Sequence, residues 1–230
     1  MRLDKYLASV TDYSRNEAKR LLKEGRIAVA GEVISDPRFD VVATAEVAID
    51  GHPLRAATAR YFMLNKPPGY VSATKDREHL TVMELLDEDN MDQLHIAGRL
   101  DIDTTGLLLI TDDGRWSHRV TSPTSHCKKT YRLETADPIT DEAKMCIEQG
   151  IKLDGEKRPT LPAEMELIDE HTARLTITEG KYHQVKRMLA AVGNRVDLLH
   201  RERIGEITLD PDLEPGEYRP LTADEVASVE

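Results

Sequence analysis

The chain has 230 residues, of which 40% are hydrophobic and 32% charged, and its 31 Lys and Arg against 42 Asp and Glu give a formal net charge of -11. This composition excludes a disordered chain, because enough apolar surface is present to form a core. The length suits one large domain or two unequal ones. Taken alone, the net charge also argues against a nucleic-acid partner.

The sequence predicts a cytoplasmic protein without a membrane partner. Its longest fully apolar runs, such as Leu107–Ile110, have about four residues, whereas a transmembrane helix needs about 20. Charged residues in Met1–Lys5 occupy the place of the apolar segment of a secretory signal. The two cysteines, Cys127 and Cys146, cannot form a disulfide framework or a CxxC metal site.

The first 57 residues are predicted to form a small helical and stranded unit. Leu3 and Leu7 give a short helix an apolar stripe, and the capping box that starts at Ser14 opens a second helix, which Gly25 closes. Short strands are expected at Ile27–Ala30, Val33–Ile34 and Glu46–Asp50. The stretch Gly51–Arg60 lacks periodicity, so we interpret it as a linker between domains 1–57 and 58–230.

Four bases are predicted to share one face of the second helix. At about 100° per residue, Arg15, Lys19, Lys23 and Arg26 fall within an arc of about 80°. A solvated helix face is the ordinary interpretation of such a run. The absence of acids from that arc favours phosphate binding instead.

The charge is strongly segregated along the chain. Five bases against two acids in Ser14–Arg26 give +3, and six against two in Lys181–Arg203 give +4. Eight acids and one base give Glu206–Glu230 a net charge of -7. Because charges act within a Debye length of about 8–10 Å, the total of -11 does not exclude RNA.

Residues 58–230 combine short strands with single helices. Strands are predicted at Tyr61–Leu64, Leu107–Thr111, Thr130–Glu134 and Arg174–Thr178, a rigid turn at Asn65–Gly69, and helices after Thr81, at His183–Val192 and after Thr222. Because these helices do not alternate regularly with parallel strands, the expected class is α+β with a mixed, mainly antiparallel sheet.

A loop of turn-forming residues precedes the strand at Leu107–Thr111. Gly98–Gly106 contains Arg99 and two acids, Asp101 and Asp103. From the residues alone the two carboxylates are compatible with an Asx turn, a metal clasp or a catalytic acid. The histidines, His183 among them, lack the spacing of a zinc site, and we expect no metal.

Several motifs together resemble the pseudouridine synthases of bacterial ribosomal RNA. Gly98–Thr111 resembles the family's central motif, and three further motifs agree with it in order: Leu64–Gly69, Lys129–Tyr131 and Gly180–Leu189. Met1–Val10 and Arg15–Gly31 resemble the small alpha-L (S4-like) RNA-binding domain of a ribosomal small-subunit protein. Within the family, Ile102–Thr105 and Ser117–Tyr131 most resemble the branch that modifies small-subunit (16S) ribosomal RNA.

The resemblance implies an isomerase that converts a uridine to pseudouridine without a metal, nucleotide or redox cofactor. Asp101 matches the family's catalytic aspartate and Lys186 the cation that pairs with it. The resemblance places Tyr131 against the flipped uracil, Val185 as an apolar wall, and Arg99 on the extruded nucleotide's phosphate or in the vacated space. The expected partner is 16S ribosomal RNA or a small-subunit assembly intermediate, and the expected state is a monomer.

Three alternatives remain at this point. One is a large-subunit (23S) ribosomal RNA enzyme of the same family. Another is a non-catalytic ribosome-assembly factor that uses the same basic segments. The last is a nucleic-acid hydrolase that uses Asp101 and Asp103 as a metal or acid pair.

Overall fold

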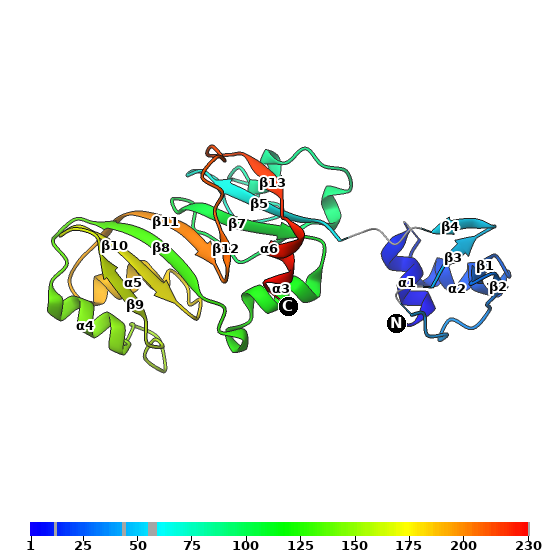
Figure 1. Cartoon of the computed structure of the whole chain (residues 1–230), viewed down its shortest axis with the longest axis horizontal. Helices are drawn as coiled ribbons and strands as arrows, with labels where there is room; N and C mark the ends of the chain where they lie inside the picture. Colours follow the sequence, from blue (N-terminus) through cyan, green and yellow to red (C-terminus); the bar gives the residue numbers. More distant parts are fainter. Residues whose placement is uncertain (12, 43–44, 55–58, 230) are drawn as a thin grey trace. The chain divides into compact units, whose positions relative to one another are not determined.

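The computed structural model describes residues 1–11, 13–42, 45–54 and 59–229. The chain divides into two compact units, Met1–Thr58 and Ala59–Glu230, whose elements are labelled in Figure 1. No helix in these described ranges is long and apolar enough to cross a membrane.

Two helices and a small sheet form the first unit. Helices α1 (Leu3–Val10) and α2 (Arg15–Lys23) pack on an antiparallel sheet whose described strands follow the order β2 (Glu32–Val33), β1 (Ile27–Val29), β3 (Val47–Ile49) and β4 (His52–Leu54). Leu3, Leu7 and Leu22 are fully buried between these layers. Ser14 caps α2 with the predicted capping box.

Two sequence predictions in this unit are wrong. Helix α2 ends at Lys23, and Gly25 has a φ of 74°, so Arg26 leads into β1 instead of extending the helix face. Part of the predicted linker Gly51–Arg60 is a strand: positive φ at Asp50 and Gly51 turns the chain so that His52–Leu54 pairs with β3. Residues 55–58 of that stretch lie outside the described residues.

The second unit is built on one mixed sheet. Its described strands follow the order β13, β5, β7, β11, β8, β10, β9, with β12 paired to β11 and β6 to β7. Their bounds are β5 Tyr61–Lys66, β6 His95–Ala97, β7 Thr105–Thr111, β8 Lys129–Thr135, β9 Glu164–Leu167, β10 Thr172–Ile177, β11 Val196–Ile204, β12 Ile207–Thr208 and β13 Tyr218–Pro220. Among these pairs, only β7 with β11 is parallel, so the α+β class with a mainly antiparallel sheet is confirmed.

Short helices cover this sheet, and two of the α-helices were not predicted. The helices are α3 Gly114–Thr121, α4 Asp141–Gln149, α5 Gln184–Ala191 and α6 Ala223–Ala227, with the 3-10 helices η1 Val82–Leu85, η2 Met91–Gln93 and η3 Pro123–Ser125. The sequence prediction missed α3 and α4, although Asp113 and Thr140 cap their first turns with side-chain hydrogen bonds. Asn65 and Lys66 extend β5, where a turn was expected.

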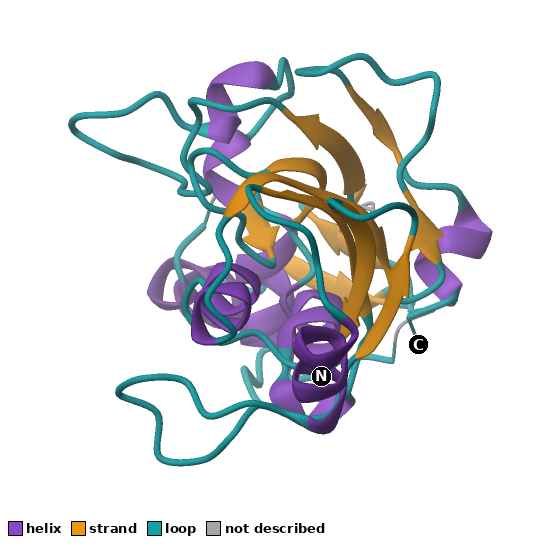
Figure 2. Ribbon diagram, turned by 90° about the vertical axis from the view of Figure 1, so that its left-hand side faces the viewer, coloured by secondary structure: helices purple, strands orange, loops and turns teal. Residues whose placement is uncertain are grey.

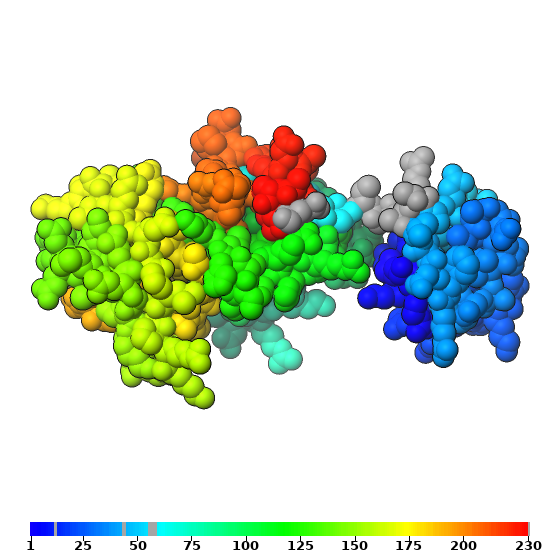
Figure 3. Space-filling view, turned by 60° about the horizontal axis from the view of Figure 1, so that its bottom comes forward, coloured from blue at the N-terminus to red at the C-terminus, as the bar shows by residue number. Residues whose placement is uncertain are grey.

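The centre of the sheet, whose strands are orange in Figure 2, is buried on both faces, because all four residues of Leu107–Ile110 in β7 are fully buried. Leu107 and Leu109 of β7 pack with Trp116 of α3, whereas Leu108 and Ile110 pack in a different cluster with η1. The C-terminal segment closes the first of these faces, since Trp116 Nε1 donates a hydrogen bond to the carbonyl of Val226. Figure 3 shows the red C-terminal segment against the green residues.

The parallel pair of β7 and β11 joins the two halves of the sheet. Gly106 lies opposite Arg201 in this pair. A Cβ atom on Gly106 would lie 2.4 Å from the carbonyl oxygen of Arg201, and the φ of Gly106 is +98°. Both the space and the backbone conformation therefore require glycine at this position.

We expect Gly106→Ala to lower the free energy of unfolding by more than about 3 kcal/mol, because backbone atoms of a buried strand would have to move. Gly155→Ala is the matched control, since Gly155 has a φ of +74° with nothing within 4 Å of a Cβ. The control should cost only the backbone strain, about 1–2 kcal/mol. Urea unfolding measures both, and equal losses would contradict the steric argument.

Candidate active site

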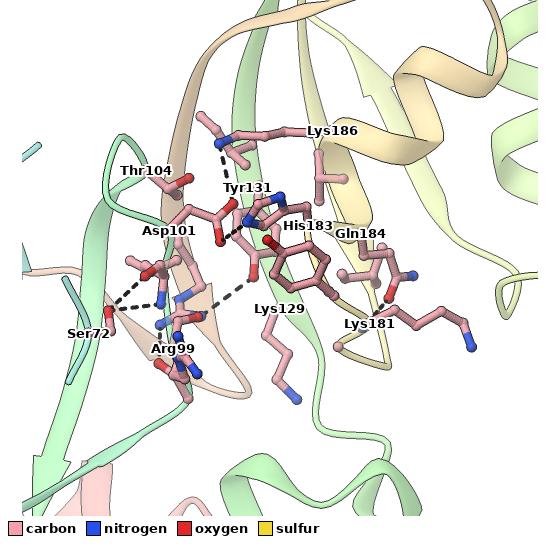
Figure 4. Close-up of a pocket in the computed structure, with 18 of the residues that line it drawn as sticks. Ser72, Arg99, Asp101, Thr104, Lys129, Tyr131, Lys181, His183, Gln184 and Lys186 are labelled. Carbon is pink, nitrogen blue, oxygen red and sulfur yellow. Dashed lines mark hydrogen bonds and ion pairs between the residues drawn. The ribbon is translucent and has the colours of Figure 1, made fainter. Parts of the chain in front are cut away.

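A cavity of about 870 Å³ lies in the second unit, beside the junction of β7 and β11. The loop 98–104, the start of β8 and the segment 180–186 line it. Figure 4 shows Asp101, Tyr131, His183 and Lys186 grouped around this space. The structure therefore brings together residues from three distant parts of the sequence.

Asp101 is partly buried between two basic side chains. Its Oδ2 lies 3.3 Å from Lys186 Nζ, and its Oδ1 lies 3.3 Å from His183 Nε2. Lys186 also donates a hydrogen bond to Asp103 at 2.6 Å. The first turns of α5 position Lys186, so one cation faces both carboxylates of the loop.

The contacts of Lys186 and Asp103 shift the pKa values of both side chains. Burial alone would lower the pKa of Lys186, but the hydrogen bond to Asp103 and the charge of Asp101 raise it. The same hydrogen bond lowers the pKa of Asp103. Lys186 therefore stays charged at neutral pH and places a positive charge beside both carboxylates.

Lys66 fixes the backbone of the loop that carries Asp101 and Asp103. Its side chain is fully buried, and Nζ donates to the backbone carbonyls of Pro67, Ile102 and Thr104 at 3.0, 3.3 and 2.8 Å. Burial lowers the pKa of Lys66 to about 8. Lys66 lies in a motif that resembles the family, but no role was predicted for it, since a lysine after an apolar run does not show where its ammonium points.

Arg201 is a second buried cation that sequence reasoning missed. It is 2% exposed, and its guanidinium donates to the carbonyls of Leu107 at 2.8 Å and Gly98 at 3.0 Å. Its Nη1 lies 3.5 Å from the Tyr131 hydroxyl. In the sequence, Arg201 was only one of the six bases of the segment Lys181–Arg203. Its position beside the loop 98–104 follows from the pairing of β11 with β7.

The other predicted residues lie around the same cavity. Tyr131 is half-buried, Val185 is buried in the core at the cavity wall, and Arg99 is exposed at the rim. Lys129 also lines the cavity, and burial lowers its pKa. Within the described residues, neither Arg99 nor Lys129 has an acidic side chain within 4.0 Å.

His183 was set aside in the sequence analysis because it showed no zinc spacing, yet it contacts Asp101 directly. It has a φ of 46°, a left-handed conformation that is unfavourable for a residue with a Cβ atom. No group of three side chains in the described parts of the chain could hold a metal ion.

Two of the four bases that were predicted to bind phosphate, Arg15 and Arg26, already form ion pairs with acidic side chains. Arg15 lies 2.9 Å from the buried carboxylate of Asp4, and Arg26 Nε lies 3.0 Å from Asp50. Burial alone would raise the pKa of Asp4, but hydrogen bonds and charges from Arg15 and Arg2 lower it. Lys19 and Lys23 have no acidic partner within 4.0 Å in the described part of the unit.

Comparison with known proteins identifies the class. Residues 60–191 match the family model described as RNA pseudouridylate synthase, and residues 1–47 match the S4 domain. A crystal structure of a pseudouridylate synthase is similar to the whole chain, with a TM-score of 0.74 and 44% identity over 100% of both chains. The chain belongs to the RNA pseudouridylate synthase family, whose members are isomerases.

Its similarity to particular relatives extends over the full length. The chain is 54% identical to ribosomal small subunit pseudouridine synthase A of Escherichia coli strain K12, covering 100% of both proteins. It is also 54% identical to the proteins of the same name from Yersinia pestis and Vibrio cholerae, covering 100% of this chain and 98% and 99% of theirs. The resemblance seen in the sequence motifs is confirmed.

We expect Lys186→Met to lower the turnover rate on RNA by about 10²–10³-fold, because Asp101 loses the cation that contacts and orients its carboxylate. Lys186→Arg keeps the charge and should stay within about tenfold of the parent. Single-turnover rates on saturating RNA measure the difference. Equal rates for the two variants would contradict a role for the charge.

Proposed function

We propose that this protein converts a specific uridine of small-subunit (16S) ribosomal RNA to pseudouridine. The observation that carries the proposal is Asp101 at the cavity, in contact with Lys186 and close to Tyr131. The full-length similarity to ribosomal small subunit pseudouridine synthases A supports a small-subunit substrate. The substrate is the free ribosomal RNA or a small-subunit assembly intermediate, and the enzyme acts as a monomer in the cytoplasm.

The reaction breaks the bond from uracil N1 to ribose C1′ and forms a bond from C5 to C1′. One proton leaves C5 and one is gained at N1, so the product is an isomer and no electrons are gained or lost. An ionised carboxylate beside the ribose and base is the group that this chemistry needs. Asp101 fits attack on C1′, addition to the base and assistance of a glycal route equally well.

The side chains around Asp101 have distinct tasks in this proposal. A base must leave the RNA stack before it reaches the carboxylate, which costs a few kcal/mol. Tyr131 lies against the flipped uracil and takes part in the proton transfer from C5, while Val185 supplies an apolar wall. Arg99, exposed and without an acidic partner among the described residues, contacts the phosphate or fills the vacated space.

The first unit supplies the phosphate contacts that hold the RNA. Lys19 and Lys23 are available for this task without breaking an ion pair in the described part of the chain. Arg15 and Arg26 add charge close to them, although Asp4 and Asp50 compensate part of it. Binding should therefore depend on the two lysines more than a count of four equal bases implies.

Asp101→Asn should abolish pseudouridine formation while RNA affinity stays nearly unchanged, because the substitution removes the charge and keeps the size. Carbodiimide mapping of ribosomal RNA from cells that carry either form measures product and locates the target. Substantial turnover by the variant would contradict the catalytic assignment. A modified position in 23S instead of 16S RNA would favour the large-subunit alternative.

Arg15→Gln and Lys19→Gln form a matched pair. Lys19→Gln should reduce the slope of log affinity against log salt by about one, because it removes one phosphate contact. Arg15→Gln should reduce the slope by less, because Asp4 already compensates part of the charge of Arg15. Only Arg15→Gln should also lower the thermal midpoint, because it removes a partner of the buried Asp4.

The pKa of Asp4 is lowered in the folded state, so this stabilisation is present at neutral pH and is lost as the pH falls below about 4. The difference in midpoint between the parent and Arg15→Gln should shrink over the same range. Equal thermal midpoints for the two variants at pH 7 would contradict the structural role of Arg15.

A further inference from the structure

Tyr182 is an exposed aromatic residue at the cavity that the mechanism above does not use. It is 75% exposed, more than any other large hydrophobic side chain in the described residues. It lines the cavity that contains Asp101. A ligand that covers this exposed ring would gain binding free energy, because it would remove apolar surface from water.

The ring is nevertheless held in a fixed orientation. It stacks on His183 with ring centroids 3.8 Å apart and an angle of 21° between the planes. The carbonyl of Tyr182 accepts a hydrogen bond of 2.9 Å from Arg187, which fixes the backbone. One face of the ring is therefore covered by imidazole, and the other is open.

The position of this open face decides what it can bind. His183 contacts Asp101 with its Nε2 edge and Tyr182 with its face, so the covered face of Tyr182 is turned to the imidazole that contacts Asp101 and the open face is turned away from that imidazole. The ribose that reacts must lie against Asp101 itself. A base on the open face of Tyr182 therefore belongs to another nucleotide of the same strand.

We propose that Tyr182, supported by His183, is a stacking platform for a nucleobase that neighbours the target uridine. This inference rests on the proposed function and adds a second base subsite to it. Stacking is available to every base, so the platform contributes affinity and register along the strand more than base identity. A nucleotide held there also opposes re-stacking of the flipped uridine.

The test uses the full chain, an RNA fragment that it converts, and abasic nucleotides placed in turn at the target's 5′ and 3′ neighbours. Tyr182→Ala should raise Kd for the intact fragment by about 5- to 150-fold, with a smaller effect on the rate at saturation. Tyr182→Phe keeps the ring and should bind like the parent, whereas Tyr182→Leu should bind like the alanine variant. Ile168→Ala, at another exposed apolar side chain, is the surface control.

The abasic fragments separate stacking from other roles. With one of the two neighbours removed, the parent should lose the affinity that Tyr182→Ala loses, and the alanine variant should lose nothing more. Independent losses, or equal binding by the leucine and phenylalanine variants, would overturn the platform. The proposed function fails separately, if the parent converts no uridine of small-subunit RNA.

Discussion

The parallel contact between β7 and β11 is the constraint on which the site depends. Gly106 must lack a side chain there so that the backbone of Arg201 can approach it. The loop with Asp101 directly precedes β7, whereas Tyr131 and Lys186 come from β8 and α5 on the other side of the junction. A shift between the two strands would separate the Asp101 carboxylate from the Lys186 ammonium. The same backbone contact is therefore needed both for folding and for the geometry of the site.

The cations around the loop 98–104 have two different roles: two contact its backbone and the third contacts its carboxylates. Lys66 and Arg201 donate to backbone carbonyls and so fix where the loop runs. Of these three cations, Lys186 is the one that contacts the carboxylates of Asp101 and Asp103. Because charged donors on carbonyls make strong hydrogen bonds in a buried setting, the loop is held before RNA arrives and needs little reorganisation.

Local patterns predicted the parts of this molecule that have local causes. The capping box at Ser14 and the apolar run of β7 each specify an element within a few residues. Helices α3 and α4 were missed because their apolar positions are few and their stability comes from packing, as with Trp116. His183 lies in the recognised motif Gly180–Leu189 but was predicted no role, since its contact with Asp101 exists only after 82 residues of chain have folded back.

Neither the net charge of -11 nor the charge of the basic segments shows which cations are available to RNA, and the reason is the same for both. Sequence counts treat charges as neighbours along the chain, whereas the fold pairs them in space. Within the segment counted as +4, Lys181 pairs with Glu179 and Arg203 with Glu206. What remains for RNA is the small set without acidic partners in the described structure, including Lys19, Lys23 and Lys129. The local charge of a surface is thus decided by which cations the fold leaves unpaired, and neither the total nor the segment counts contain that information.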